Sequence, residues 1–413
     1  MKLTTPAARL LTFILLLLAV QCGIARAQVV WTFDQVLQAA LATHPVLLGK
    51  RSGQAAAQAD LEGAKWQRFP TASIEKPLPA SSASSALVRI EQPMWTGGRI
   101  SASIDAAGGR LAAAGAALDE EALNVSLRVI AAYAEALRQT ARQEHAIEGV
   151  AQHEKLLAMI RRRVAQEVSS HSDQRLAESR MYQAVNEQSG ASQALANALM
   201  QLSQLAGSPV AQIAGLALRP IGAAPGLDAA VAQAQAYSPT LRRLDHEQAA
   251  AQADIASRRS AYLPQLVLRL EKSTGQINDS RAMLVLLAQP GAGLSAMAGV
   301  SGAVARLEAL RMAAEGAQRD TRERLTLDWN EWTAARLRVD NAGLASDMSG
   351  EVLDSYTRQY VIGRKSWNDV LNAVRELTQS QFALEDARAQ ASAAALRLGA
   401  QCGTLKHLVR TTP

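Results

Sequence analysis

The chain has 413 residues, of which 48% are apolar and only 4% aromatic, with a formal net charge of +6. This composition is too apolar for a disordered chain and too poor in Phe and Tyr for an ordinary compact enzyme of this size. Alanine supplies much of the apolar content, and alanine favours helix while it lets helices approach closely. We therefore expect long, thin helical packing.

The first 27 residues have the pattern of a secretory signal peptide. An apolar stretch of 11 residues, Leu10 to Val20, follows a basic N-terminus and is too short to span a bilayer as a helix. Ala25 and Ala27 form an A-x-A cleavage site, so the mature chain is expected to begin at Gln28. Removing three basic residues and no acidic one lowers the charge from +6 to +3, which weakens any argument for a nucleic-acid partner.

The full chain contains two cysteines. Cys22 precedes the expected cleavage site, and its acylation as a lipoprotein is the alternative route of processing, which the large Gln21 before it disfavours. Only Cys402 remains after cleavage, so an intrachain disulfide is excluded in the mature chain.

An internal duplication is visible in the positions of the prolines. The recurring dipeptides are His44-Pro45 with Ser238-Pro239, Phe69-Pro70 with Leu263-Pro264, and Gln92-Pro93 with Gln289-Pro290. The offset is 194 for the first two pairs and 197 for the third, which is typical of two copies of one unit with small insertions. We therefore expect a first repeat over 28–208, a linker rich in proline and glycine over 209–226, a second repeat over 227–405 and a C-terminal tail over 406–413.

Each repeat contains a long stretch without proline. The stretches after Pro93 and after Pro290 are rich in good helix formers, and apolar residues recur every seven positions at Leu111, Leu118 and Val125. A seven-residue repeat predicts left-handed coiled-coil packing. A helix from about 98 to 166 would be roughly 100 Å long.

Segments with a period of two lie between the short helices and the long ones. Leu266, Leu268 and Leu270 alternate with Val267, Arg269 and Glu271. Val88 and Ile90 alternate with Arg89 and Glu91, so we predict one hairpin in each repeat. Two prolines limit the first strand to about 71–76. Apolar-out, polar-in alternation in an exported chain fits the strands of a transmembrane barrel, although a small soluble hairpin has the same pattern.

The number of predicted strands sets a condition on membrane insertion. Four strands cannot close a barrel, because the smallest transmembrane barrels have eight, and open sheet edges are not tolerated in lipid. Three chains, giving twelve strands, are the simplest closed solution. Each barrel would continue into a tube of long helices.

Three motifs give the chain a family resemblance. They are the paired openings at Pro45 and Pro239, the segment 92–99 with its turn at Gly97 and Gly98 where the long helix starts, and the segment 360–371. In these motifs the chain resembles the TolC family of outer-membrane channel proteins, the exit ducts of efflux pumps and type I secretion systems. The resemblance implies a mainly helical, TolC-like homotrimer with a twelve-stranded barrel in the outer membrane of a Gram-negative bacterium and a periplasmic helical tube. The run 363–367 is most similar to the subgroup that exports large adhesins.

The resemblance also implies a gate at the periplasmic entrance. By position, Tyr360 and Lys365 lie on the inner coiled coil and Asp173 on the outer one, where charge-assisted hydrogen bonds would hold the entrance shut. Asp369 is expected in the constriction, where three copies form an acidic ring that favours cations, and Asn372 replaces a second acid. The family usually has arginine where Lys365 stands, so this latch is expected to be looser. The same residues are also typical of the ordinary polar surface of a helical hairpin.

No motif points to catalysis or to a bound cofactor. The sequence lacks a phosphate-binding loop, a nucleophile elbow and an H-E-x-x-H zinc motif, so neither an enzyme nor a cofactor is expected. His145 and His153 lie eight residues apart, about two helical turns, which is too far to chelate one metal. The run Arg161 to Arg163 is expected to be a solvated face, with adaptor docking as the alternative.

The predicted function is a passive trimeric conduit for type I protein secretion across the periplasm and the outer membrane. Its partners would be a periplasmic adaptor, an inner-membrane transporter of the ABC type and outer-membrane lipid, with no nucleic acid. The alternative is the outer-membrane component of a drug or small-molecule efflux pump, which would pair with a proton-driven transporter. A soluble periplasmic coiled-coil adaptor or binding protein is the rival from another class. The sequence alone does not distinguish a drug, a small metabolite or a secreted protein as the cargo.

Overall fold

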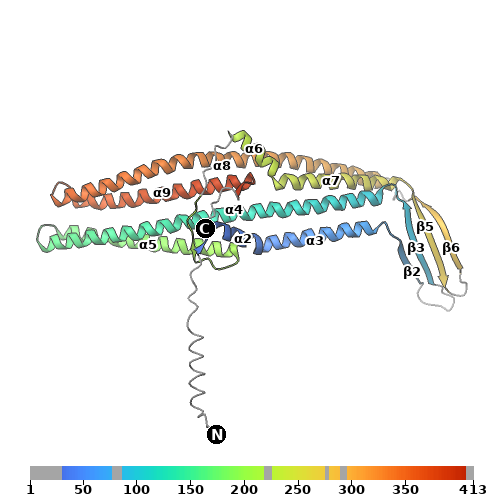
Figure 1. Ribbon diagram of the computed structural model, residues 1–413, viewed down its shortest axis with the longest axis horizontal. Coiled ribbons are helices and arrows are strands. Elements are labelled where there is room, and N and C mark those ends of the chain that lie inside the picture. Colours follow the sequence, from blue (N-terminus) through green and yellow to red (C-terminus); the bar gives the residue numbers. More distant parts are fainter. Residues whose placement is uncertain (1–29, 77–85, 218–225, 275–278, 289–294, 406–413) are drawn as a thin grey trace, which may run out of the picture.

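The computed structural model describes residues 30–76, 86–217, 226–274, 279–288 and 295–405. The expected cleavage site at Ala25 and Ala27 and the tail 406–413 lie outside these residues. Long helices run along the longest axis of the molecule, and a small sheet lies at one end of them (Figure 1). None of the described helices is long and apolar enough to cross a membrane.

The order of elements repeats once along the chain. The first repeat has helices α2 (Phe33–Thr43), α3 (Pro45–Trp66), α4 (Arg99–Ala165) and α5 (His171–Ala206), with strands β2 (Thr71–Glu75) and β3 (Ala86–Trp95) before α4. The second repeat has helices α6 (Gly226–Tyr237), α7 (Pro239–Arg259), α8 (Ser295–Val361) and α9 (Trp367–Gln401), a 3-10 turn η1 (Ser260–Tyr262), and strands β5 (Gln265–Thr274) and β6 (Asp279–Leu287) before α8. The predicted duplication is therefore present in the fold.

The first long helix begins and ends close to its predicted range, and the two predicted proline openings start shorter helices. Helices α4 and α8 each have 67 residues and are therefore about 100 Å long at 1.5 Å per residue. Pro45 and Pro239 occupy the first positions of α3 and α7, where the missing N–H costs no helical hydrogen bond. The predicted range of 98–166 for the first long helix differs from α4 by one residue at each end.

The four longer strands form one antiparallel sheet in the order β2-β3-β5-β6. Hairpins β2-β3 and β5-β6 come from the two repeats, and β3 pairs with β5 to join them, with Ile90 opposite Leu270. Strand β2 has five residues, in agreement with the short first strand that the prolines predict. Two further strands, β1 (Val30–Trp31) and β4 (Gln212–Ile213), form a separate parallel pair near the middle of the molecule.

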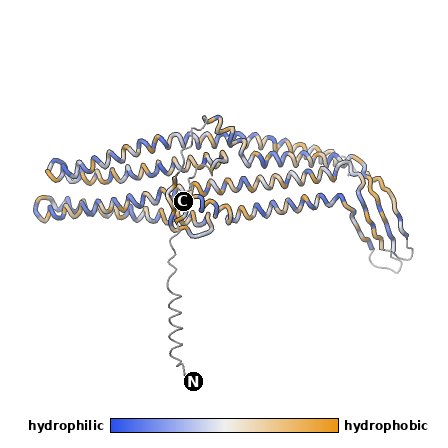
Figure 2. The backbone as a smooth tube through the Cα atoms, viewed as in Figure 1, coloured by the Kyte–Doolittle hydropathy of each residue, from blue (hydrophilic) through white to orange (hydrophobic). Residues whose placement is uncertain are grey.

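Hydrophilic and hydrophobic residues alternate along the strands of the sheet (Figure 2), and because successive side chains point to opposite faces, the two faces differ in polarity. One face exposes large apolar side chains, namely Ile74, Ile90, Leu268, Leu270, Leu284 and Leu286. On the other face Arg89 pairs with Glu271 at 2.9 Å, and Arg269 pairs with Glu91 at 2.8 Å. The sheet therefore has an apolar face without a described partner and an opposite face on which charges neutralise one another.

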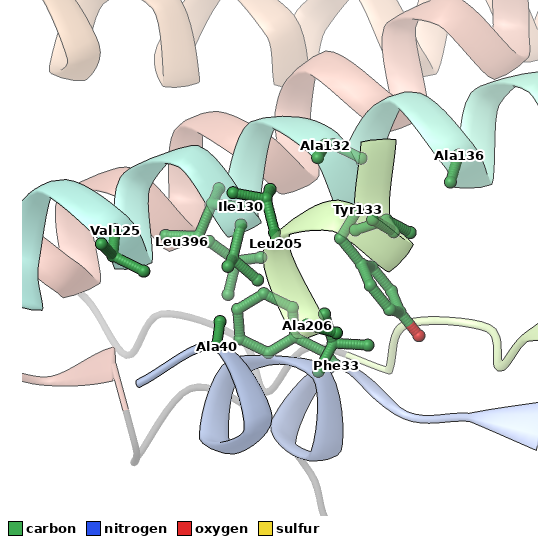
Figure 3. Close-up of a cluster of buried hydrophobic side chains, with 14 of the residues drawn as sticks. Phe33, Ala40, Val125, Ile130, Ala132, Tyr133, Ala136, Leu205, Ala206 and Leu396 are labelled. Carbon is green, nitrogen blue, oxygen red and sulfur yellow. The ribbon is translucent and has the colours of Figure 1, made fainter. Parts of the chain in front are cut away.

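The largest core lies about midway along the helices and joins α2, α4, α5 and α9. Phe33 meets Tyr133 edge to face with ring centroids 5.4 Å apart, and both lie among residues such as Leu205 and Leu396 (Figure 3). The Tyr133 hydroxyl donates to the carbonyl of Ala214 at 2.7 Å, which ties the segment after β4 to α4. Buried alanines let these helices approach closely, as the composition predicts.

Candidate functional site at the helix tips

The two hairpins of long helices, α4-α5 and α8-α9, end in turns of the same kind. In the first turn the N–H of Val168 donates to the carbonyl of Arg163, and in the second the N–H of Arg364 donates to that of Gln359, both at 2.9 Å. This is the pattern of a helix that ends in a left-handed residue. That residue is Glu167, with φ of 59°, in the first turn and Gly363, with φ of 77°, in the second.

Both acidic candidates cap the helix that follows the turn. Asp173 accepts a hydrogen bond from the N–H of Ser170 at 3.3 Å, while its own N–H donates to the Ser170 hydroxyl at 3.1 Å. Asp369 and Ser366 make the same reciprocal pair at 3.0 and 3.2 Å. Hydrogen bonds from Ser366, and the nearby charge of Lys365, lower the pKa of Asp369 below its ordinary value. The S-x-x-D spacing is the sequence signal for these capping boxes, and sequence reasoning overlooked it.

A buried aromatic cluster joins the two tips. The Trp367 indole N–H donates to the main-chain carbonyl of Asp173 at 3.2 Å, and the Trp367 ring lies 5.1 Å from that of Tyr360. The guanidinium of Arg163 lies over the Tyr360 ring at 4.9 Å. Trp367 and Tyr360 are only 4% and 7% exposed, so the contact between the hairpins is nearly dry.

The predicted latch residues lie at the same tip, but their side chains have other partners. The carboxylate of Asp173 caps α5, and the ammonium of Lys365 lies 4.1 Å from the centre of the Tyr356 ring. The expected ion pair between Asp173 and Lys365 is therefore not formed among the described residues of a single chain. Asp369 lies at the start of α9, and the half-buried Asn372 follows one turn later.

The arginine run near the first tip is only partly solvated. Arg161 forms an ion pair with Glu178 at 3.1 Å, and hydrogen bonds from Gln174 and Arg161 lower the pKa of that carboxyl. Arg162 is exposed, but Arg163 packs on Tyr360 and donates to the Ser169 hydroxyl at 3.3 Å. The expectation of a solvated face is therefore wrong for Arg163, because an arginine stem and planar head group can cover an aromatic ring.

The two helical histidines have different surroundings. His145 lies within 3.9 Å of Glu385, whereas His153 is 7% exposed and its Nδ1 finds no hydrogen-bond partner among the residues that the structure describes. Burial and the charge of Arg180 lower the pKa of His153. Within the described ranges, no group of three or more His, Cys, Asp or Glu side chains is arranged to hold a metal.

The turn that starts α4 requires its two glycines. Gly97 and Gly98 have φ of 60° and 87°, and a Cβ on Gly97 would lie 2.9 Å from the Cβ of Leu263. Exposed apolar side chains surround this junction between helices and sheet: Trp66, Phe69, Met94, Trp95, Tyr262 and Leu263. The rings of Trp66 and Phe69 lie in tilted contact there, with centroids 5.0 Å apart.

Comparison with known proteins relates this geometry to a family. Residues 36–208, most of the first repeat, match the outer membrane efflux protein family. The solved structure of VceC, an outer membrane protein from Vibrio cholerae, is 18% identical with a TM-score of 0.77, and the match covers 90% of this chain and 96% of VceC. The chain has a TolC-like fold. The sequence-based recognition of this fold is thereby confirmed.

Two further structures have the same TolC-like fold. A membrane protein from Pseudomonas aeruginosa is 20% identical with a TM-score of 0.78, covering 90% of this chain and 93% of that one. CusC is 16% identical with a TM-score of 0.79, covering 90% and 91%. No curated protein sequence matches the chain. The structural matches extend over both repeats, so the second repeat completes the TolC-like fold beyond the segment that matches the family.

Proposed function

We propose that the chain is a passive channel subunit that assembles as a homotrimer in the outer membrane, with its long helices in the periplasm. The observation that carries this proposal is the four-stranded sheet with an exposed apolar face that leads directly into helices about 100 Å long. Strands β3 and β5 have ten residues and β6 has nine, which is the length of a strand that crosses a bilayer.

The position of apolar side chains supports this orientation. The exposed aromatic and apolar residues at the junction of sheet and helices form a belt where the periplasmic surface of the membrane would lie. The charged pairs Arg89-Glu271 and Arg269-Glu91 would then face the lumen. A soluble periplasmic adaptor, the rival function, gives no reason for an apolar sheet face of this size.

The open edges of the sheet and the exposed apolar side chains of two helices support a closed trimer. Strands β2 and β6 are the outer strands of the sheet, and an open edge is not stable in lipid. Helices α5 and α8 expose a further set of large apolar side chains: Tyr182, Met200, Leu327, Leu337, Leu344 and Met348. Neighbouring chains would cover both kinds of edge. Native mass spectrometry of the detergent-purified protein is expected to give three chains per particle.

The gate is proposed at the helix tips, with Tyr360, Lys365, Asp173, Asp369 and Asn372 around the entrance. Tyr360 and Lys365 both contribute to packing there, through Arg163 and Tyr356. Replacing Tyr360 by Ala and Lys365 by Gln together removes the ring under Arg163 and the ammonium over Tyr356, so it is expected to raise the single-channel conductance of the protein in planar bilayers. If neither the parent protein nor this variant forms a pore, and the protein fractionates with the soluble periplasm, the channel function is wrong.

The proposed cargo is a protein exported by type I secretion, with a periplasmic adaptor and an ABC transporter as partners. The support is the run 363–367 and its similarity to the subgroup that exports adhesins. The alternative is small-molecule efflux with a proton-driven transporter, which the description of the matched family favours. Deleting the gene distinguishes them, because secretion predicts loss of a large surface protein and efflux predicts higher sensitivity to toxic small molecules.

A further inference from the structure

Trp367 makes a hydrogen bond between the two helical hairpins of one chain. It is the first residue of α9, and the carbonyl that accepts from its indole belongs to Asp173, in the first turn of α5. The N–O distance is 3.2 Å, and the two residues are 194 positions apart. The bond therefore links the tip of the second repeat to the tip of the first.

The surroundings of this bond make it effective. Trp367 belongs to a buried cluster that also contains Leu157 and Ile160 from α4 and Val370 from α9. Tyr360 lies between the Trp367 ring and the guanidinium of Arg163, which comes from α4. Because water is largely excluded, the hydrogen bond is stronger than it would be at the surface, and an unpaired indole N–H would carry a full desolvation penalty.

The acceptor does not depend on the side chain at position 173. The carboxylate of Asp173 is occupied by the capping box with Ser170, whereas its main-chain carbonyl receives the indole N–H. The position equivalent to Trp367 in the first repeat is His171, which is exposed. Only one of the two duplicated helix starts can therefore make this contact.

We propose that Trp367 is the intrachain clamp that keeps the periplasmic entrance closed, an inference that rests on the proposed channel function. Separating the α8-α9 hairpin from the α4-α5 hairpin breaks the indole bond, exposes the Trp367 ring and removes Tyr360 from Arg163. The contacts that hold the entrance closed therefore lie within each chain. A partner that opens the entrance must supply the free energy needed to separate the two hairpins.

The test is the conductance of the full-length protein in planar bilayers. Trp367→Phe removes the indole donor and keeps an aromatic ring, so it is expected to raise the mean conductance several-fold. Asp173→Asn removes a carboxylate charge from the proposed gate but keeps the main-chain acceptor, so it is expected to raise the conductance less than Trp367→Phe does. Trp332→Phe changes a tryptophan of α8 that lies outside the tip cluster, so it is the matched control and is expected to keep the conductance of the parent protein. Thermal melting of each variant checks that a rise in conductance does not come from loosened folding.

Three outcomes overturn the clamp. Trp367→Phe conducts no better than Trp332→Phe while the Tyr360 and Lys365 double variant opens, which leaves the channel function intact. Asp173→Asn opens the pore and Trp367→Phe does not, which assigns the latch to the carboxylate. In the third outcome, neither the parent protein nor any variant forms a pore, which overturns both the clamp and the proposed channel function.

Discussion

The two helix tips have the same turn and the same capping box, yet different residues at two equivalent positions. The left-handed residue is Glu167 in the first tip and Gly363 in the second, and the first helical residue after the turn is exposed His171 in one and buried Trp367 in the other. The backbone was thus retained by both copies, while the side chains diverged. The second tip has the residue that inserts, and the first tip supplies the carbonyl that receives it.

Truncating the side chains at the equivalent positions 367 and 171 is expected to give the largest difference in stability between the tips. Trp367→Ala removes a nearly buried indole and leaves a cavity, so it is expected to cost about 3 to 5 kcal/mol of stability. His171→Ala at the equivalent exposed position is expected to change stability by less than about 0.5 kcal/mol. Urea unfolding of the detergent-purified protein measures both. Equal losses would show that burial at position 367 does not distinguish the tips.

Substitutions at the two residues with a left-handed backbone, Gly363 and Glu167, are expected to have the next largest effect on stability, with opposite signs in the two tips. Gly363→Ala has open space around its new Cβ but a φ of 77°, so it is expected to destabilise by about 1 to 2 kcal/mol. Glu167→Gly relieves the same strain at a φ of 59° and is expected to stabilise the protein by about 0.5 to 1 kcal/mol. The gain is smaller than the loss at Gly363 because glycine also raises the entropy of the unfolded chain, which offsets part of the relief. The midpoints of thermal unfolding should move in opposite directions. A loss on Glu167→Gly would indicate that the Glu167 side chain makes a stabilising contact.

Most of the fold could be predicted from local signals. Prolines and glycines fix the ends of the long helices, and the period of two identifies the hairpins, because both depend on neighbours in sequence. The role of Trp367 could not be predicted, since its acceptor is 194 residues away and is a main-chain atom. The capping role of Asp173 was readable in the S-x-x-D spacing but was overlooked, and the family resemblance led only to the expected latch. The place of Trp66 at the junction could not be predicted from the strand pattern, because Trp66 ends helix α3 and does not belong to a strand.

The two capping boxes share the same pair of bonds between backbone and side chain, so they test the part of the comparison where the tips agree, although the Ser366 hydroxyl also donates to the Asp369 carboxylate at 2.8 Å. Ser170→Ala and Ser366→Ala each remove a hydroxyl that accepts from the N–H three residues later, so each is expected to cost about 1 kcal/mol. Ser170→Thr and Ser366→Thr keep the acceptor and serve as controls. A loss in only one tip, measured by urea unfolding, would contradict the common backbone.

The smallest expected effect is a dependence of stability on pH that only the first repeat has. His153 is buried on α4, facing Arg180 and Glu187 of α5 and Arg375 of α9, and the equivalent position in α8 is Ser349. Because the pKa of His153 is lowered in the folded protein, its contribution is fully present above the unfolded value of about 6.5 and is lost as pH falls through the folded value. His153→Leu is therefore expected to flatten the unfolding midpoint between about pH 7 and pH 5, while Ser349→Ala keeps the slope of the parent protein. If the unfolding midpoint of His153→Leu depends on pH as steeply as that of the parent protein, the acid sensitivity does not come from His153. It would then come from carboxylates such as Asp369 and Glu178, whose pKa values are lowered in the folded protein and which lose their stabilising contribution at lower pH.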